Sequence, residues 1–205
     1  MLTFVVTGGI TRVWAQAREV DRLAAQQLAQ RAIDALIEGE DATGVEAQRA
    51  AYRKGLALAQ QAVAADTQNA DGHFALFATS GRLALLNNPT PNPFELMRLN
   101  RELDRVLELD PNHPDALTAK GGIYRQLPRL LGGNISTAQA YLSRAIALDP
   151  DNVAARIELA RVHRDAGQPE RAVPLLREAA AIAIRRGRSR KADEIGQLLR
   201  EMGAP

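Results

Sequence analysis

The side chains best suited to chemistry in this chain are three histidines, His73, His113 and His163, and an arginine-rich run near the C-terminus. A zinc site built from histidine needs closely paired ligands, such as two histidines on one face of a helix. Here the histidines stand 40 and 50 residues apart, and the chain has no cysteine. The sequence therefore predicts no metal site, no disulfide and no cofactor.

Patterns typical of phosphate binding and catalysis are also missing. Gly8-Gly9 and Gly132-Gly133 lack the third glycine and the Lys-Ser/Thr pair of a phosphate-binding loop. No nucleophile stands beside a general base, and most acidic residues lie near arginine, as Glu178 lies beside Arg177. We therefore expect a non-enzymatic binding protein without catalytic residues.

The basic run from Arg185 to Lys191 has two interpretations. One is a site for an anion such as phosphate, nucleic acid or an acidic lipid head group. The other is that Arg185 and Arg186 close a helix whose C-terminal dipole favours cations, while Arg190 and Lys191 are solvated. The net charge is only +2, and no second basic stripe accompanies the run. This favours the second interpretation, and no nucleic-acid partner is expected.

The elements that position these residues are helices. Hydrophobic residues make up 46% of the chain but aromatic residues only 4%, so Ala and Leu, both strong helix formers, must do most of the packing. They recur at three- and four-residue spacing, and the alternation of strands is absent. Gly39 is expected to end the first helix. Proline, glycine and this periodicity predict nine helices, over residues 14–37, 45–65, 71–86, 94–109, 114–126, 136–148, 153–166, 169–186 and 189–202.

Three helix ends share one pattern, in which Asp66, Asp110 or Asp149 follows an apolar helical end. Aspartate is expected to cap the helix that follows, and the prolines after two of these residues cannot continue a helix. Recurrence of such helical hairpins is typical of a solenoid. The interval between Pro111 and Pro150 is 39 residues, and the extra length falls in the turn around 126–134.

With these features the chain resembles the tetratricopeptide repeat family, whose period is about 34 residues. The resemblance implies an all-α, right-handed superhelical solenoid of helical hairpins with a C-terminal capping helix, which would cover the last hairpin through Ile195, Leu198 and Leu199. The residues that carry it are Gly121, Tyr124, Ala138, Leu142, Ala145 and Pro150 in one unit, and Leu159, Ala160, His163, Gly167, Ala172, Leu176 and Ala179 in the next. Ala138, Ala145, Ala160, Ala172 and Ala179 are expected to pack between helices.

The same resemblance implies a scaffold that binds a protein or peptide on a concave side built from the first helix of each hairpin. The family's clamp for acidic C-terminal tails needs Asn where this chain has Ala119 and Glu158, so that clamp is absent. An arginine-bearing, partly apolar groove still suits an anionic peptide or a small acid. The alternative is that these arginines are ordinary exposed residues. The residues expected on the concave side are Phe74, Ala78 and Arg82, then Thr118, Gly122 and Arg125, then Ile157, Arg161 and Arg164.

The long turn Leu127–Asn134, followed by an Ala-rich helix, resembles a hairpin of the T-component proteins associated with bacterial TRAP transporters. That resemblance implies an exported, oligomeric accessory protein that binds a small ligand or a solute-binding protein. Because three leucines in a turn are poorly placed in water, Leu127, Leu130 and Leu131 are expected to cover something. The surface that they would cover is the neighbouring hairpin, one end of a ligand groove or a second subunit. A local plug of their own hairpin is the alternative.

The N-terminal segment also has two interpretations. Leu2 to Ile10 is a mostly apolar run, and Ala15-Gln16-Ala17 has the small-x-small form of a signal-peptidase site. No basic residue precedes the run, and Arg12 stands where a cleavage region is normally uncharged. Residues 1–17 are therefore a clipped export signal, which implies a periplasmic location, or an arm packed on the first helix. The cytoplasm is favoured. Residues 18–205 are expected to form a single domain, and no run is long enough to span a bilayer.

Overall fold

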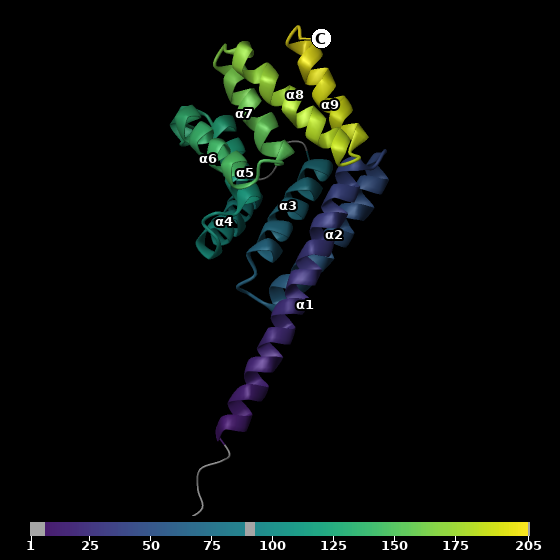
Figure 1. The fold of residues 1–205 in the computed structure, drawn as a ribbon, viewed down its shortest axis with the longest axis vertical. Helices are drawn as coiled ribbons and strands as arrows, with labels where there is room; N and C mark the ends of the chain where they lie inside the picture. The colour runs from purple at the N-terminus through teal and green to yellow at the C-terminus, as the bar shows by residue number, and fades with distance from the viewer. Residues whose placement is uncertain (1–6, 89–92, 205) are drawn as a thin grey trace, which may run out of the picture. The chain divides into compact units, whose positions relative to one another are not determined.

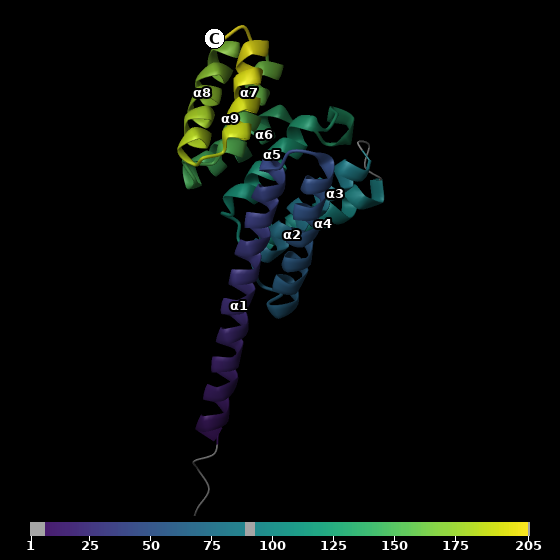
Figure 2. The same cartoon turned by 90° about the vertical axis from the view of Figure 1, so that its right-hand side faces the viewer.

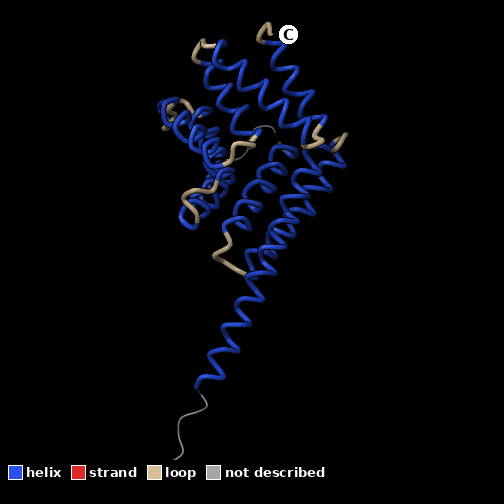
Figure 3. Tube along the Cα trace, in the orientation of Figure 1, coloured by secondary structure: helices blue, strands red, loops and turns tan. Residues whose placement is uncertain are grey.

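The computed structural model describes residues 7–88 and 93–204, with side chains from 16 to 88 and from 97 to 204. Within these residues the fold is all-α, as predicted, and contains no strand (Figures 1 and 3). Most predicted helix ends agree with the structure to within one residue. The helices are α1 (Thr7–Asp41), α2 (Val45–Ala65), α3 (Ala70–Asn87), α4 (Pro93–Leu109), α5 (Pro114–Gln126), α6 (Ile135–Leu148), α7 (Val153–Asp165), α8 (Pro169–Arg185) and α9 (Ser189–Glu201), with a short 3-10 helix, η1 (Arg129–Leu131).

The chain divides into two compact units, Met1–Arg105 and Val106–Pro205. In the first unit α1 packs on α2 and α3, and α2 packs on α3; in the second, each helix from α5 to α9 packs on the next, and α5 also packs on α7. Contacts between neighbouring helices and between first helices of successive hairpins are those of stacked helical hairpins. Compact units also arise inside one solenoid, so the expected single domain over 18–205 stays a prediction.

The first helix is longer than predicted at both ends. Its N-terminal half projects beyond α2 and α3 (Figures 1 and 2), and the side chains from 16 to 24 are exposed. Residues 7–17 are part of α1, and residues 2–6 of the apolar run lie outside the described residues. No described helix combines the length and hydropathy needed to cross a bilayer.

The expected end of α1 at Gly39 is wrong, since the helix continues to Asp41. Gly39 serves a close approach between helices instead. A Cβ at this position would lie 2.3 Å from Cε1 of Tyr52 on α2. A glycine that makes room for a ring inside a helix and a glycine that ends a helix look the same in sequence.

The three helix ends that share an aspartate lead into one recurring four-residue turn, at 66–69, 110–113 and 149–152. In each turn the aspartate Oδ1 accepts a hydrogen bond from the backbone N–H two residues later, at 2.9, 2.9 and 3.0 Å. The fourth residue then caps the next helix. In each cap a side chain accepts a hydrogen bond from a backbone N–H. Asn69 accepts from Gly72 at 2.8 Å, His113 from Ala116 at 3.3 Å and Asn152 from Ala155 at 2.9 Å.

This arrangement corrects one expectation. The aspartates do not cap the following helix, because each is occupied in holding its own turn. The cap falls to the residue three positions later, which is asparagine twice and histidine once. His113 is thereby explained as a structural residue, since its ring nitrogen takes the place of an amide oxygen.

The alanines predicted to lie between helices are buried, which confirms the repeat alignment in the second unit. All five have at most 1% of their surface exposed. The predicted capping helix is also confirmed, because Ile195 and Leu199 of α9 are buried in one apolar cluster with Leu176 and Ile182 of α8, and Leu198 packs against that cluster. The core of this unit therefore runs without a break from α7 to α9.

The structure places the extra length of the longer repeat in the predicted turn. The connection from α5 to α6 has eight residues, 127–134, whereas the corresponding connection from α7 to α8 has three, 166–168. Eight minus three leaves five extra residues, the difference between the 39-residue interval and the family period of about 34.

Candidate functional site

Three of the predicted concave residues come together where α5 packs on α7. Arg125 on α5 points across to α7, where its Nε donates to Glu158 Oε2 at 3.0 Å and its Nη1 donates to Asp165 Oδ2 at 3.0 Å. The Arg125 side chain is only 13% exposed, and that of Glu158 only 16%. A single guanidinium thus joins two carboxylates seven positions apart on one face of α7.

Two further arginines on α7 share the same carboxylates. Arg161 Nη1 donates to Glu158 Oε1, and Arg164 donates through Nε and Nη2 to Asp165 Oδ1 at 3.1 and 2.9 Å. The five side chains form a continuous chain of ion pairs, which we call the Arg125 network. With three cations and two anions, the Arg125 network has a net charge of +1.

The charge state of the network follows from its contacts. Burial alone would raise the pKa of Asp165, but hydrogen bonds from Arg164 and Arg125, together with their positive charges, outweigh burial and lower it below the ordinary value of 3.8. Asp165 is therefore ionised at neutral pH and stays available to hold both arginines.

Arg161 and Arg164 differ from Arg125 in their exposure. Their side chains are 36% and 43% exposed, so the carboxylates fix one side of each guanidinium and solvent reaches the other. Within the described residues, Nε and Nη2 of Arg161 and Nη1 of Arg164 have no acceptor. The network therefore presents oriented, unused donors at its surface.

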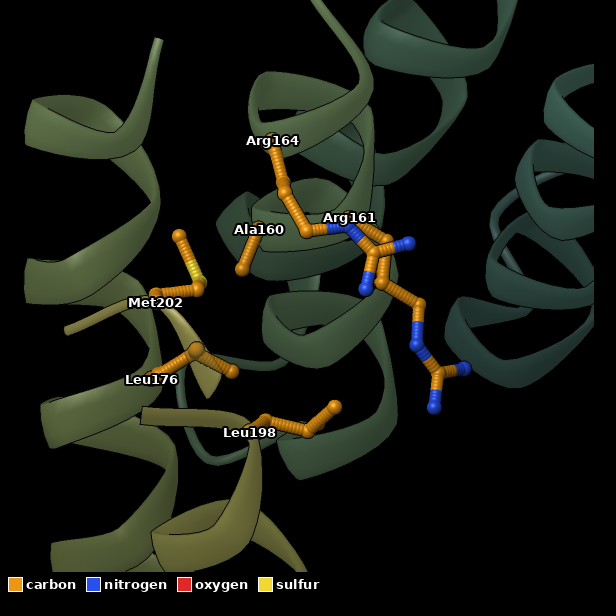
Figure 4. A pocket seen from close by; sticks show the side chains of 6 residues that line it. All are labelled: Ala160, Arg161, Arg164, Leu176, Leu198 and Met202. Carbon is orange, nitrogen blue, oxygen red and sulfur yellow. The ribbon is translucent and has the colours of Figure 1, made fainter. Parts of the chain in front are cut away.

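A shallow pocket lies beside these two arginines, between α7, α8 and the end of α9 (Figure 4). Its space of about 180 Å³ includes open solvent, and the part sheltered by the protein is about the size of one water molecule. In Figure 4 the guanidinium groups lie to one side of the apolar side chains. An apolar side chain can lie against the apolar wall, and the two exposed guanidinium groups can bind a carboxylate. The residues that line the pocket are Ala160, Arg161, Arg164, Leu176, Leu198 and Met202.

Two other predicted concave residues in this unit are buried and support the fold. Thr118 donates its hydroxyl to the carbonyl of Pro114 at 2.9 Å, inside α5. Ile157 belongs to the apolar cluster of α7, α8 and α9. Neither side chain offers an exposed surface for a partner, because the helices around them close over both positions.

The first-unit residues, Phe74 and Arg82, lie on α3. Phe74 is half-buried and its ring lies 6.1 Å from that of Phe77, centroid to centroid. Arg82 forms an ion pair with Glu40 of α1. Both residues link or cover helices of their own unit, and their role in binding stays a prediction.

The apolar turn does not bury its leucines. Leu130 is 98% exposed and Leu131 69%, and Leu127 is also exposed. Within the second unit, these leucines therefore neither plug their own hairpin nor pack on the neighbouring one. The turn forms its own hydrogen-bonded structure and directs these side chains outward, and the partner contact expected for them stays a prediction.

The other candidate groups have structural partners. His73 lies 2.9 Å from Glu102 Oε2 and 3.1 Å from the carbonyl of Thr67, and His163 lies 3.2 Å from Gln168 Oε1. In the basic run, Arg185 and Arg186 lie 3.1 and 3.6 Å from Asp151, while Arg190 and Lys191 lie 3.6 and 2.8 Å from Glu194. These pairs agree with the interpretation of the run as a helix end and a solvated surface.

Reasoning from the sequence missed Glu158 and Asp165 as members of the site. In the sequence, Glu158 stands out only because it occupies a position where the family's clamp has Asn. The available signal was the spacing of Glu158, Arg161 and Asp165, which places all three on one face of a helix. Glu158 and Asp165 pair with Arg125, which lies 33 and 40 residues earlier in the sequence. This pairing depends on how α5 packs on α7.

Comparison with known proteins agrees with this architecture. Residues 129–183 match the family model of the tetratricopeptide repeat. The chain is similar to a thermophilic tetratricopeptide repeat protein of Thermus thermophilus, with 19% identity over 73% of this chain and 78% of that one and a TM-score of 0.50. It is also similar to PilF of Pseudomonas aeruginosa, with 17% identity over 92% of this chain and 79% of that one and a TM-score of 0.52.

At these identities the two solved structures show the fold alone. A search among curated protein sequences gives no significant match. None of these comparisons points to a transport-associated accessory role.

Proposed function

Because this chain carries tetratricopeptide repeats, we propose that it is a non-enzymatic scaffold that binds a protein or peptide partner at Arg161, Arg164 and the adjoining pocket. The partner segment carries an acidic residue beside a bulky apolar one. The acidic group pairs with the two arginines, and the apolar side chain lies against the shallow apolar surface formed by α7, α8 and α9.

The observation that carries this proposal is the orientation of the two half-exposed guanidinium groups. Glu158 and Asp165 hold them in place before a ligand arrives, so less side-chain entropy is lost on binding. Guanidinium binds carboxylate through directed, charge-assisted hydrogen bonds, and the unused nitrogens supply the donors. In the alternative, Arg161 and Arg164 are ordinary surface residues whose only role is to pair with Glu158 and Asp165, and the experiment below separates the two.

The pocket limits what stands next to the acidic group. Its apolar wall comes from Ala160, Leu176, Leu198 and Met202, and its space of about 180 Å³ includes solvent. The pocket is too shallow to enclose a side chain, so an apolar side chain of the partner lies against this wall and stays partly in solvent. The methionine in the wall adapts to side chains of different shape.

Selection of peptides from a random displayed library on the immobilised full chain tests the proposal. We expect enrichment of sequences with Asp or Glu next to Leu, Met or Phe. The double variant Arg161→Ala/Arg164→Ala should bind the selected peptides on the order of tenfold more weakly or worse, and added salt should weaken wild-type binding. Arg185→Ala is the matched control, because Arg185 is an exposed, ion-paired arginine of the same unit outside the pocket.

Two results would contradict the proposal. One is a set of selected peptides without enrichment of acidic residues. The other is equal affinity of the wild type and the double variant for those peptides, with Arg185→Ala unchanged. Unfolding is not expected to interfere, because Arg161 and Arg164 are surface residues whose truncation changes stability little.

A further inference from the structure

The turn between α5 and α6 exposes four apolar side chains at the tip of a helical hairpin. Leu130 is almost completely exposed, and Leu127, Leu131 and Ile135 are exposed beside it in sequence. Single exposed leucines are ordinary on protein surfaces, but an exposed apolar cluster at one tip usually has a partner. We call residues 127–135 the leucine tip.

The leucine tip is a structured element. Asn134 N–H donates to the carbonyl of Tyr124 at 3.0 Å, which closes the turn, and Leu131 N–H and Gly133 N–H both donate to the carbonyl of Pro128, at 2.9 and 3.0 Å. The ring of Tyr124 stacks on Tyr141 with centroids 5.6 Å apart, so the base of the turn is fixed. The leucines therefore point outward because the backbone holds them there.

Two glycines make this conformation possible. Gly132 has φ of 91°, in the left-handed region, and the Cβ of any other residue at Gly133 would lie 1.7 Å from the carbonyl oxygen of Leu127. The Gly-Gly pair thus allows the backbone conformation that exposes the leucines. This role explains the pair without a phosphate-binding loop.

The charged residues of the segment that contains the leucine tip all have one sign. From residue 116 to residue 148 the sequence contains no aspartate or glutamate, and its charged residues are Lys120, Arg125, Arg129 and Arg144. Arg125 is neutralised by α7, whereas Arg129, inside the tip itself, forms no ion pair with the described residues. The segment 116–148, which exposes the leucines, therefore has no carboxylate of its own, and Arg129 is an unneutralised cation beside them. The one carboxylate of this hairpin is Asp115, in the first turn of α5.

We propose that the leucine tip docks on the surface of an anionic lipid bilayer. Leu130 and Leu131 enter the boundary between head groups and acyl chains, with Leu127 and Ile135 beside them, while Arg129 lies at the level of the lipid phosphates. A fluid bilayer accepts a protruding tip of any shape, whereas a protein partner must supply a pocket that matches it. The missing carboxylates remove the repulsion that would otherwise oppose approach to anionic lipid.

This surface shares no residue with the pocket of α7, α8 and α9 and differs from it in chemistry. A scaffold with both would hold a peptide partner close to a membrane. The lipid proposal does not depend on the peptide proposal, since neither Arg161 nor Arg164 belongs to the tip, and each is tested by its own variants.

Flotation of the full chain with vesicles tests the inference. Vesicles that contain phosphatidylglycerol should bind the wild type, and vesicles of pure phosphatidylcholine should bind it much less. The triple variant Leu127→Ser/Leu130→Ser/Leu131→Ser should lose binding by on the order of tenfold or more, because three inserted apolar side chains are removed. Its melting temperature should match that of the wild type, since these side chains are exposed. Ile184→Ser is the control, because Ile184 is 67% exposed on α8 of the same unit.

A second measurement locates the contact. The chain has no cysteine, so Leu130→Cys or Ile184→Cys provides a single site for an environment-sensitive fluorophore. The label at 130 should shift to shorter wavelength on anionic vesicles, and the label at 184 should not.

Three results would overturn the proposal. They are absence of wild-type binding to anionic vesicles at low salt, equal binding of the triple variant, and equal spectral shifts at 130 and 184. If the wild type does not bind vesicles but is a dimer that the triple variant converts to a monomer, the tip is a contact between two copies of this chain instead.

Discussion

Arg125 Nη1 and Asp165 Oδ2 lie 3.0 Å apart, although 40 residues separate the two in sequence. This contact fastens the first helix of one hairpin to the first helix of the next. The same guanidinium also holds Glu158, so one poorly exposed side chain sets the positions of two carboxylates and, through them, of Arg161 and Arg164.

Removing that central cation should destabilise the second unit. Arg125→Ala leaves Glu158, which is mostly buried, with less compensation, and we expect the free energy of unfolding to fall by about 2–3 kcal/mol. Arg164→Ala is the control and should change it by less than about 1 kcal/mol, because Arg164 is much more exposed. Urea unfolding of both variants measures the difference, and equal losses would contradict a central role for Arg125.

The ion pairs of Asp165 predict a pH dependence of stability. Because its folded-state pKa lies below the ordinary value of 3.8, ionised Asp165 stabilises the folded chain above about pH 4, and this contribution disappears as the pH falls through the folded-state pKa. Asp165→Asn should therefore be less stable than the wild type at neutral pH, and the gap should close in acid. Urea unfolding across a pH series checks this, and a gap independent of pH would refute the assignment.

The repeat packing predicts a large effect at Ala172. This residue is completely buried among α7, α8 and α9, so Ala172→Arg forces a long charged chain into a close contact between helices. We expect a loss of at least about 3 kcal/mol in the free energy of unfolding. Ala181→Arg, on an exposed position of the same helix, should melt like the wild type. An unchanged melting temperature for Ala172→Arg would count against the repeat alignment.

The capping helix should be needed for solubility. Deletion of residues 188–205 removes Ile195 and Leu199 and uncovers the apolar side chains of α8 that they bury. The truncated chain should aggregate, which size-exclusion chromatography detects. Ile195→Ala is the milder change and should cost about 2–4 kcal/mol through the cavity that it leaves. A monomeric truncated chain as stable as the wild type would show that α9 does not act as a cap.

The helices were predictable because their ends are marked locally. Proline at the start of α5 and α8, and the apolar periodicity before Asp110 and Asp149, depend on residues a few positions apart. The prediction at Gly39 was wrong because the partner that explains this glycine, Tyr52, lies on another helix. Local rules give the ends of helices and miss the contacts between them.

The candidate site was predictable only in part. Repeat alignment selected Arg125, Arg161 and Arg164, which the structure joins in one network, and binding at this face stays a prediction. It did not separate exposed from buried positions on that face, so Thr118 and Ile157 were included although neighbouring helices cover both. The pocket needs Leu198 and Met202 from the capping segment. Leu198 was expected to cover the last hairpin, but no repeat pattern places it beside Arg161 and Arg164.

The recurring turn described at 66–69, 110–113 and 149–152 gives the chain two kinds of connection with different tolerance to change. These three joints have four residues each, whereas the hairpin tips that lie wholly within the described residues, at 42–44, 127–134 and 166–168, have three, eight and three. The length of these connections varies at the hairpin tips, where a longer loop does not change how the helices stack. For engineering, the tips are the places to graft a foreign epitope or a linker to another domain. An insertion in a joint would displace the residue that caps the next helix and change the angle between successive hairpins.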